Sequence, residues 1–517
     1  MTIRSLDKLC AILSGLMLTA AFPPSNTPWI AWIALVPLLK AISGKSAGSA
    51  FALGLTAGVA HYGSLVYWIV VVLEHYGGLH LLTSLGVLAL FCFYLALYPA
   101  LFALLSRGFQ LRPFRVLGLS ALWVSVEFIR AKALTGFPWC LLGHTQHAWL
   151  DLIQISDVAG VYGISFLLVA SNALLYNLIF HPGFLRMALG KLESLVVILL
   201  VSGTLFYGVT RFKQVREGGE HRKTLKVAIA QGDIDQSIKW NPRYQERTIR
   251  IYEELSLDAA TFGPDLTLWP ETAVPFFFYD HPELSLRVLK VAENLHSTLI
   301  FGGPAYRRQP EGIKFYNRAY MISPQGRMAG HYDKIHLVPF GEYVPLKRFL
   351  PFVNRLVPAA GDFAAGEKLA PLATPLLPAG VLICFEVIFP ELAAAQVRAG
   401  AEILLNLTND AWFGRTSAPH QHLAMAVFRA VENRRPLFRA ANTGISAFIS
   451  PAGEITGRSG LFTRQLLKQE VPLSETSRSF YTLYGDVFAG ILLLLTLIQT
   501  VLNIYYKVTR SSRAPRE

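Results

Sequence analysis

Charged residues are scarce in this chain. Asp, Glu, Lys and Arg make up 16% of its 517 residues and hydrophobic residues 53%, whereas a soluble domain usually carries about a quarter charged residues. This composition excludes a disordered chain, a coiled coil and a collagen-like protein. Because one hydrophobic core rarely serves more than about 250–300 residues, we expect more than one domain.

Cysteine is also rare. The chain has four, at Cys10, Cys92, Cys140 and Cys384, and no two lie at a metal-ligand spacing. A structural zinc site and a disulfide framework are therefore not expected.

Long apolar runs, by contrast, are abundant. Eight of them approach the roughly 20 residues that span a bilayer: 9–22, 29–39, 47–73, 81–105, 116–129, 161–180, 195–207 and 487–506. The first two are short and separated by prolines, so we expect them to be tilted or one of them to be re-entrant. The pattern predicts a membrane domain at 1–210 with about seven transmembrane helices, a C-terminal transmembrane helix at 487–506 and a tail at 507–517.

Basic residues gather in alternate loops of this membrane domain. They are Arg4, Lys8, Lys40, Lys45, Arg107, Arg112, Arg115, Arg186 and Lys191, with Lys507, Arg510, Arg513 and Arg516 after the last run. The positive-inside rule then places both termini in the cytoplasm. The basic residues at 211–223 conflict with this orientation, but long translocated domains obey the rule weakly. Much of the net charge of +13 is thus a topology signal, and with no nucleic-acid motif beside it we expect no nucleic-acid partner.

Glu127 is the one acidic residue inside a predicted span. A carboxylate within a membrane is costly and is a functional candidate by default. Arg130 lies one helical turn away, which favours a structural ion pair.

The region 223–477 has a different pattern of apolar residues. Short apolar runs of strand length, such as 225–230, 266–269, 381–383 and 403–407, alternate with helical stretches at 242–260, 282–295, 390–398 and 420–433. The alternation predicts a layered α/β domain with its functional site at strand ends.

Reactive side chains follow three of these predicted strands. The run 265–271 ends in Glu271, the run 330–342 carries Lys334 and Glu342, and the run 381–386 carries Cys384 and Glu386. Taken singly, each has an ordinary reading as an exposed acid, a solvated lysine or a small buried thiol. Together, a carboxylate base, a cation for an oxyanion and a thiol nucleophile are what acyl transfer through a thioester needs.

At these residues the chain resembles the nitrilase superfamily. Further segments resemble its membrane-embedded branch, the apolipoprotein N-acyltransferases: Gln231 to Trp240, Trp269-Pro-Glu271, Tyr332-Asp-Lys334 through Pro345, Asn406 to Phe413, Arg439 to Ser446 and Gly136-Phe-Pro-Trp139. The resemblance implies a polytopic α-helical membrane domain plus an α-β-β-α nitrilase-like sandwich.

The resemblance also implies roles for individual residues. Cys384 is the expected nucleophile, Glu271 the general base and Lys334 the cation beside the oxyanion, while Glu342 and Glu386 support the site. Substrate binding is assigned to Trp240, Phe385, Trp412 and Trp139. Phe385 stands where many relatives have Tyr, so it keeps an aromatic wall but has no hydroxyl for proton transfer.

The implied substrates are a phospholipid and a lipoprotein precursor. Cys384 is expected to take the sn-1 acyl chain, with phosphatidylethanolamine the expected donor, and to pass it to the α-amine of an N-terminal diacylglyceryl-cysteine. No metal or organic cofactor is required. The implied setting is a monomer in the bacterial inner membrane with its catalytic domain on the periplasmic side.

Two aromatic stretches flank the predicted site, at 274–279 and 344–353. They are either part of the core of the α/β domain or arms that dip into the membrane interface, where aromatic and basic residues are favoured.

Two other functions compete with acyl transfer to a lipoprotein. A membrane-tethered nitrilase-type amidase would use the same three residues and deliver the acyl group to water. A transporter or lipid-binding scaffold with a vestigial site is a different class, and the intact Glu271, Lys334 and Cys384 argue against it.

Overall fold

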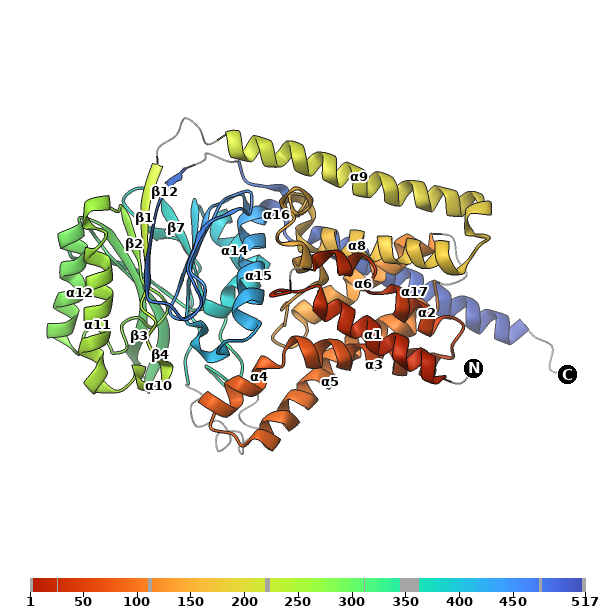
Figure 1. Ribbon diagram of the computed structural model, residues 1–517, viewed down its shortest axis with the longest axis horizontal. Coiled ribbons are helices and arrows are strands. Elements are labelled where there is room, and N and C mark those ends of the chain that lie inside the picture. The colour runs from red at the N-terminus through yellow and green to blue at the C-terminus, as the bar shows by residue number, and fades with distance from the viewer. Residues whose placement is uncertain are drawn as a thin grey trace. The chain divides into compact units, whose positions relative to one another are not determined.

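The computed structural model describes residues 3–25, 27–109, 114–218, 224–310, 312–344, 362–473 and 477–513. The chain forms two compact units, each discontinuous in sequence (Figure 1). The helical unit comprises Met1–Tyr67, Leu85–Thr210 and Asp486–Glu517, and the α/β unit comprises Trp68–Ser84 and Arg211–Gly485. Apart from Val344, the predicted arm at 344–353 lies outside the described residues, as do the last four residues of the tail.

The helical unit is built from helices of very different lengths. They are α1 (Ser5–Ala20), η1 (Pro28–Trp32), α2 (Val36–Ile42), α3 (Ala47–Leu65), α5 (Leu81–Ser106), α6 (Arg115–Lys132), η3 (Leu142–Gln146), α7 (Leu150–Ile153), α8 (Ser156–Phe180), η4 (Phe184–Arg186), α9 (Ala188–Glu217) and α17 (Val487–Arg513), the first and last few residues of some passing into the other unit. Among the described residues, α5, α8, α9 and α17 are long and apolar enough to cross a membrane.

The remaining apolar runs differ from the single spans that hydropathy predicts. The run at 29–39 is split between η1 and α2, each with a proline in its first turn. The run at 47–73 is α3 followed, after a bend of 49°, by α4 (Trp68–Val71) and η2 (Val72–Tyr76). The run at 116–129 lies in α6, which carries four charged residues over 18 positions. Hydropathy averages over these backbone breaks and charges, so it does not resolve them.

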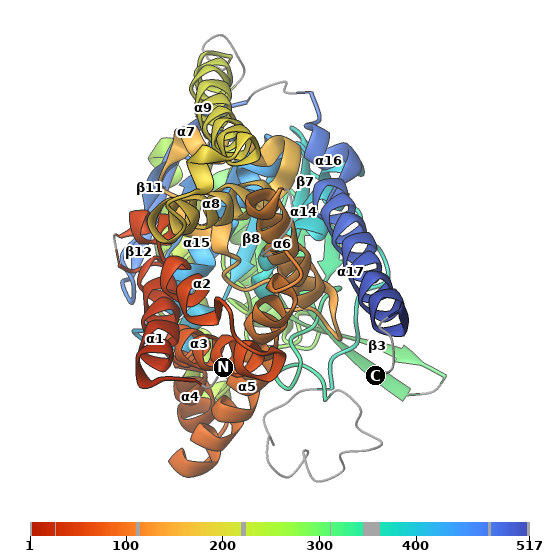
Figure 2. The same ribbon diagram turned by 90° about the vertical axis from the view of Figure 1, so that its right-hand side faces the viewer.

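Small residues let α1, α3 and α5 approach one another closely, and Figure 2 shows the three helices side by side. A Cβ atom on Gly15 would lie 2.3 Å from the main-chain oxygen of Ala57, and one on Gly54 would lie 2.6 Å from the Cβ atom of Ala103. Such small-residue contacts are typical of helix packing in membranes.

The α/β unit contains two six-stranded sheets. One has the order β12-β1-β2-β3-β4-β5 and the other β11-β10-β9-β8-β7-β6. The strands are β1 (Thr224–Gln231), β2 (Leu266–Leu268), β3 (Thr298–Gln309), β4 (Gly312–Ile322), β5 (Met328–Asp333), β6 (Leu372–Ala373), β7 (Pro378–Ile383), β8 (Ile403–Thr408), β9 (Leu437–Ala441), β10 (Ala447–Ile449), β11 (Ile455–Arg458) and β12 (Gln465–Pro472). Strands β1, β2 and β3 are mutually parallel, as are β7, β8 and β9.

Helices cover the outer face of each sheet (Figure 1). They are α10 (Gln236–Lys239), α11 (Pro242–Leu257), η5 (Ala260–Phe262) and α12 (Pro282–Leu295) on the side of the first sheet, and η6 (Cys384–Ile388), α14 (Pro390–Arg398), η7 (Asp410–Phe413), α15 (Ala418–Asn433) and α16 (Phe480–Tyr484) on the side of the second. Residues such as Ile229, Leu268, Val381 and Leu405 form a buried core between the sheets. A second core joins α11 and α12 to the first sheet. The result is the expected α-β-β-α sandwich.

Candidate active site

Glu271 lies just after β2, on a turn whose backbone packs directly against the backbone of β3. A Cβ atom on Gly302 of β3 would lie 2.6 Å from the Cα atom of Glu271, so glycine is needed there. The side chain is buried, and its Oε1 accepts a hydrogen bond of 2.7 Å from Nδ2 of Asn317. Its Oε2 accepts one of 2.9 Å from the main-chain N–H of Asn409. The carboxylate is therefore fixed from two sides.

Lys334 follows β5 directly and is 1% exposed. Its Nζ lies 2.9 Å from Oε2 of Glu342 and 3.8 Å from Oε1 of Glu271. Burial alone would lower the pKa of Lys334, but the carboxylates of Glu342 and Glu271 raise it above its ordinary value. The lysine is thus a permanent cation at neutral pH. Asn317 joins the two carboxylates, because its Nδ2 also donates to Oε1 of Glu342 at 2.8 Å.

Cys384 is the first residue after β7 and has a φ of 50°. This left-handed conformation is unusual for a residue other than glycine and recurs at functional turns. Burial, and then the negative charge of Glu271, raise the pKa of the thiol, while Lys334 opposes the shift. The structure therefore brings Glu271, Lys334 and Cys384 within electrostatic reach of one another, with the sulfur protonated at neutral pH.

Glu386 is fully buried and ties the two sheets together at this end. Its Oε1 accepts hydrogen bonds from the hydroxyl of Tyr332 at 3.0 Å and from the main-chain N–H groups of Ile335 and His336 at 2.7 and 3.0 Å. Its Oε2 accepts one of 2.7 Å from the N–H of Ile383. Burial raises the pKa of Glu386 to about 7, against the effect of the main-chain donors. The residue links the segment that carries Lys334 to Ile383, the last residue of β7, directly before Cys384.

The four aromatic candidates lie in different surroundings. Phe385 is half-buried and its ring lies 5.3 Å from that of Phe389, centroid to centroid. Trp240 follows α10 and is 47% exposed. Trp139 is buried in the helical unit.

Trp412 lies in η7 and packs against a segment that precedes α5 in the sequence. The ring of Tyr76 meets it edge-on at 5.1 Å, and the Tyr76 hydroxyl donates to the main-chain oxygen of Ala411 at 2.9 Å. Trp68 meets Phe413 in the same way at 4.9 Å. Residues 68–84 thereby form part of the α/β unit.

Sequence reasoning missed three neighbours of Glu271. Asn317 and the N–H of Asn409 bind its carboxylate, and Lys239 is fully buried with its Nζ 3.3 Å from the Glu271 main-chain oxygen. Burial lowers the pKa of Lys239 to about 7. The burial of Asn317 in the second half of β4 is visible only in the structure.

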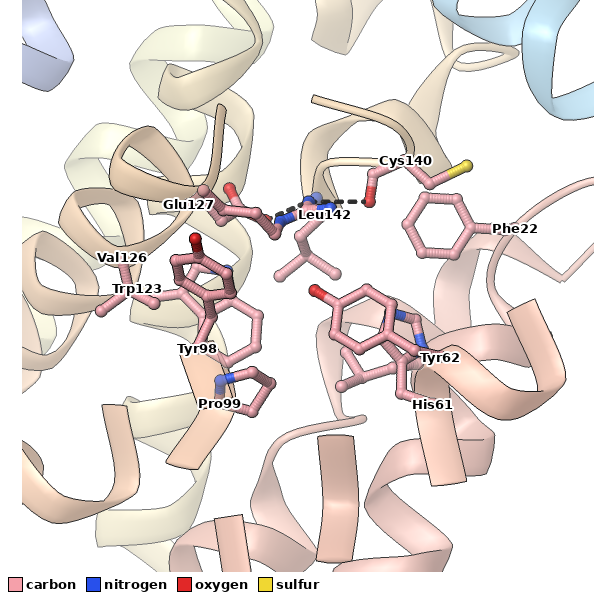
Figure 3. Close-up of a pocket in the computed structure, with 12 residues that line it drawn as sticks. Phe22, His61, Tyr62, Tyr98, Pro99, Trp123, Val126, Glu127, Cys140 and Leu142 are labelled. Carbon is pink, nitrogen blue, oxygen red and sulfur yellow. Dashed lines mark hydrogen bonds between the residues drawn. The ribbon is translucent and has the colours of Figure 1, made fainter. Parts of the chain in front are cut away.

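A small cavity of about 20 Å³, lined mainly by apolar and aromatic side chains, lies inside the helical unit (Figure 3). Glu127 and Arg130 line it, and both bind the turn at 137–142 that contains Trp139. Arg130 Nη1 donates to the main-chain oxygens of Phe137 and Trp139 at 3.2 and 3.0 Å. Glu127 Oε1 accepts from the N–H of Leu142 at 2.8 Å. Glu127 therefore binds the main chain of this turn, in addition to its electrostatic interaction with Arg130.

No group of three or more His, Cys, Asp or Glu side chains in the described part of the chain is arranged to hold a metal ion.

Two family models match the chain, one mainly over the helical unit and one over the α/β unit. The apolipoprotein N-acyltransferase N-terminal domain matches residues 14–174, and the carbon-nitrogen hydrolase domain matches residues 226–479. Among solved structures, the chain is similar to the amidase from Nesterenkonia sp. AN1, with 21% identity, 48% of this chain and 91% of that chain covered, and a TM-score of 0.37.

Whole-length relatives carry the same family name. The apolipoprotein N-acyltransferase of Geobacter metallireducens is 48% identical over 93% of this chain and 92% of that protein. The one from Methylococcus capsulatus is 32% identical over 92% of each. Both the membrane half and the catalytic half are thus shared, and the chain belongs to the apolipoprotein N-acyltransferase family.

Proposed function

We propose that this chain transfers the sn-1 acyl chain of a phospholipid, through a thioester on Cys384, to the α-amine of the N-terminal diacylglyceryl-cysteine of a lipoprotein precursor. The observation that carries the proposal is the meeting of Glu271, Lys334 and Cys384 at strand ends of the α/β unit. The names of the relatives supply the class of acceptor.

The first half of the reaction forms the thioester. Because its pKa is raised, the Cys384 thiol holds its proton until attack. Glu271 takes that proton as the sulfur bonds to the ester carbonyl, and Lys334 stabilises the oxyanion of the tetrahedral intermediate. The C–O bond of the ester then breaks, Glu271 returns the proton to the departing oxygen, and a lysophospholipid leaves.

The second half transfers the acyl group to nitrogen. An α-amine has a pKa of about 7.7–8.0, so a useful fraction is nucleophilic at neutral pH. The amine attacks the thioester, and Glu271 accepts its proton. The C–S bond then breaks, Glu271 passes that proton to the departing sulfur to restore the thiol, and the amide is released. Neither half calls for a metal or an organic cofactor.

Finer assignments are part of the same proposal. Phosphatidylethanolamine is the donor, and Trp240, Phe385, Trp412 and Trp139 bind the substrates. The protein works as a monomer in the bacterial inner membrane with the α/β unit in the periplasm, as the alternating basic loops favour. Reporter fusions after residue 223 test the orientation: a fusion active only in the cytoplasm would reverse it.

The acyl-enzyme is tested with phospholipid alone. Purified protein is incubated with phosphatidylethanolamine and no lipoprotein, and Cys384 is examined by mass spectrometry while lysophospholipid is measured. A double-displacement enzyme acquires one acyl group and releases one lysophospholipid. Release that occurs only with lipoprotein, without any adduct, would show direct transfer. Continuous release of free fatty acid would favour the membrane-tethered amidase.

A further inference from the structure

A fully buried polar cluster lies behind the proposed nucleophile. Its members come from β8, η7, α15 and β9, and none of their side chains reaches solvent: Asn406, Thr408, Asp410, His422 and Arg439. The reaction scheme above uses none of them. A buried cluster of this kind is costly unless its groups are paired, so its contacts are informative.

Arg439 is the centre of the cluster. Its Nη2 donates to Oδ2 of Asp410 at 2.7 Å and lies 2.9 Å from Nδ1 of His422. Asp410 in turn accepts a hydrogen bond of 2.9 Å from the Thr408 hydroxyl. Arg439 also donates through Nη1 to Oδ1 of Asn406. The guanidinium is therefore neutralised by Asp410 while one of its arms fixes the amide of Asn406.

The amide of Asn406 holds the turn at Cys384. Its Nδ2 donates to the main-chain oxygen of Leu382 at 2.9 Å and to that of Cys384 itself at 3.4 Å. These two carbonyls lie on either side of the peptide that enters the left-handed residue. With Oδ1 fixed by Arg439, the amide cannot rotate away, so both donors stay on the turn.

We propose that Asn406 and Arg439 are positioning residues that hold the main chain at Cys384 so that its sulfur faces Glu271 and Lys334. The inference rests on the proposed function in one respect, the assignment of Cys384 as the nucleophile. Neither residue touches the reacting atoms. Their contribution is to keep the thiol in a single orientation, and small errors in such an orientation cost rate steeply.

The test replaces Asn406 by aspartate. Asn406→Asp keeps an oxygen acceptor for Arg439 and removes both donors to the turn. The matched control is Asn433→Asp: Asn433 is also a fully buried amide of the α/β unit, which donates to the Arg429 main-chain oxygen at 3.0 Å and accepts from Thr482 at 2.9 Å. Both variants are made in the full-length protein.

Three quantities are measured for each variant. They are the single-turnover rate of acylation by phosphatidylethanolamine, the rate of Cys384 alkylation by iodoacetamide as a function of pH, and the thermal midpoint. We expect Asn406→Asp to slow acylation by about 10- to 100-fold and to shift the pH dependence of alkylation, because a displaced thiol changes its distances to the charges of Lys334 and Glu271. Asn433→Asp is expected to leave both close to wild type at a similar thermal midpoint.

Acylation and alkylation of Asn406→Asp within twofold of wild type would overturn the proposal. An equal loss in Asn433→Asp would also overturn it, since the effect would then be a general loss of packing. If Asn406→Asp does not fold, Arg439→Lys is measured instead against Arg435→Lys, whose buried arginine binds main-chain oxygens of Ala401 and Arg434. A wild-type protein that never becomes acylated would refute the thioester mechanism. The positioning role would still be tested in that case, because the alkylation rates are measured without an acyl donor.

Discussion

The ammonium of Lys334 lies nearer to Glu342 than to Glu271, at 2.9 Å against 3.8 Å. The closer carboxylate neutralises much of the lysine charge, and Asn317 donates to both acids at 2.7 and 2.8 Å. Glu271 is thus held near the cation without being locked to it. This arrangement suits the role proposed for Glu271, in which the carboxylate takes and returns a proton.

Replacing Glu342 by Gln should narrow the pH range of activity. Glu342 raises the pKa of Lys334, so its removal lets burial pull that pKa down, and the cation is lost at a lower pH. We expect transfer at pH 7 to fall about 10- to 100-fold, less than for loss of an oxyanion donor itself, and the alkaline limb of the pH–rate profile to move to lower pH. The exposed Glu254 of α11 supplies the control, Glu254→Gln. A profile that keeps its alkaline limb would remove Glu342 from this role.

Cys384→Ser should abolish acyl transfer while the protein still folds. An alkoxide is far harder to generate than a thiolate in a site that already raises the pKa of the thiol. The expected loss is on the order of 10³-fold or more, measured as N-acylation of a lipoprotein substrate. Cys10→Ser, at a half-exposed position of α1, should behave as wild type. Substantial activity in the Cys384 variant would exclude the thioester.

Glu271→Gln should block formation of the thioester. A glutamine oxygen can still accept the hydrogen bond of Asn317, but its NH2 group cannot accept the one from the N–H of Asn409, so the base and one of the two hydrogen bonds are lost together. General-base removal usually costs about 10²- to 10⁴-fold. Single-turnover release of lysophospholipid is the measurement, and circular dichroism checks the fold. Release at the wild-type rate would assign the proton transfer to another group.

Glu127 should tolerate an amide but not truncation. Gln keeps an oxygen for the N–H of Leu142, whereas Ala leaves that buried donor unpaired, at a cost of about 1–3 kcal/mol. We expect Glu127→Gln to have a thermal midpoint in detergent close to wild type and Glu127→Ala a clearly lower one. Equal midpoints for the two variants would show that the hydrogen bond to the turn is dispensable.

Tyr76→Phe isolates the hydroxyl from the ring. It loses the hydrogen bond to Ala411 and keeps the contact with Trp412, so the free energy of unfolding should fall by only about 0.5–1.5 kcal/mol. Tyr76→Ala loses both. If Trp412 binds substrate, Tyr76→Ala should also raise KM for the lipoprotein, and an unchanged KM would argue that Trp412 does not depend on Tyr76.

Local chemistry explains which elements the sequence predicts well. The bounds of α12 and α14 agree with the predicted helices, because a proline in the first turn marks where each begins. The predicted strand at 403–407 agrees with β8 to within one residue, whereas the predicted run at 381–383 covers only the second half of β7. The apolar runs of the helical unit were predicted less accurately, because average hydropathy does not reveal the bend after α3 or the charges of α6.

In the candidate site, too, some residues could be predicted from the sequence and others could not. Resemblance to known motifs, more than any spacing, pointed to Glu271, Lys334 and Cys384, and their catalytic roles stay predictions. Asn317 lies 46 positions from Glu271, and Asn406 acts on Cys384 from 22 positions away. Such partners are set by strand register and by the packing of two sheets, which no local pattern in one sequence encodes.

The pairing of Tyr76 with Ala411 also constrains how the protein is made. The two residues are 335 positions apart, and Trp68 reaches Gln421 across 353. The segment at 68–84 leaves the ribosome long before η7 and α15 exist, so the surroundings of Trp412 can be completed only late in synthesis. A shortened fragment of residues 211–485 would never complete them, because it lacks the aromatic rings that cover Trp412 and Phe413.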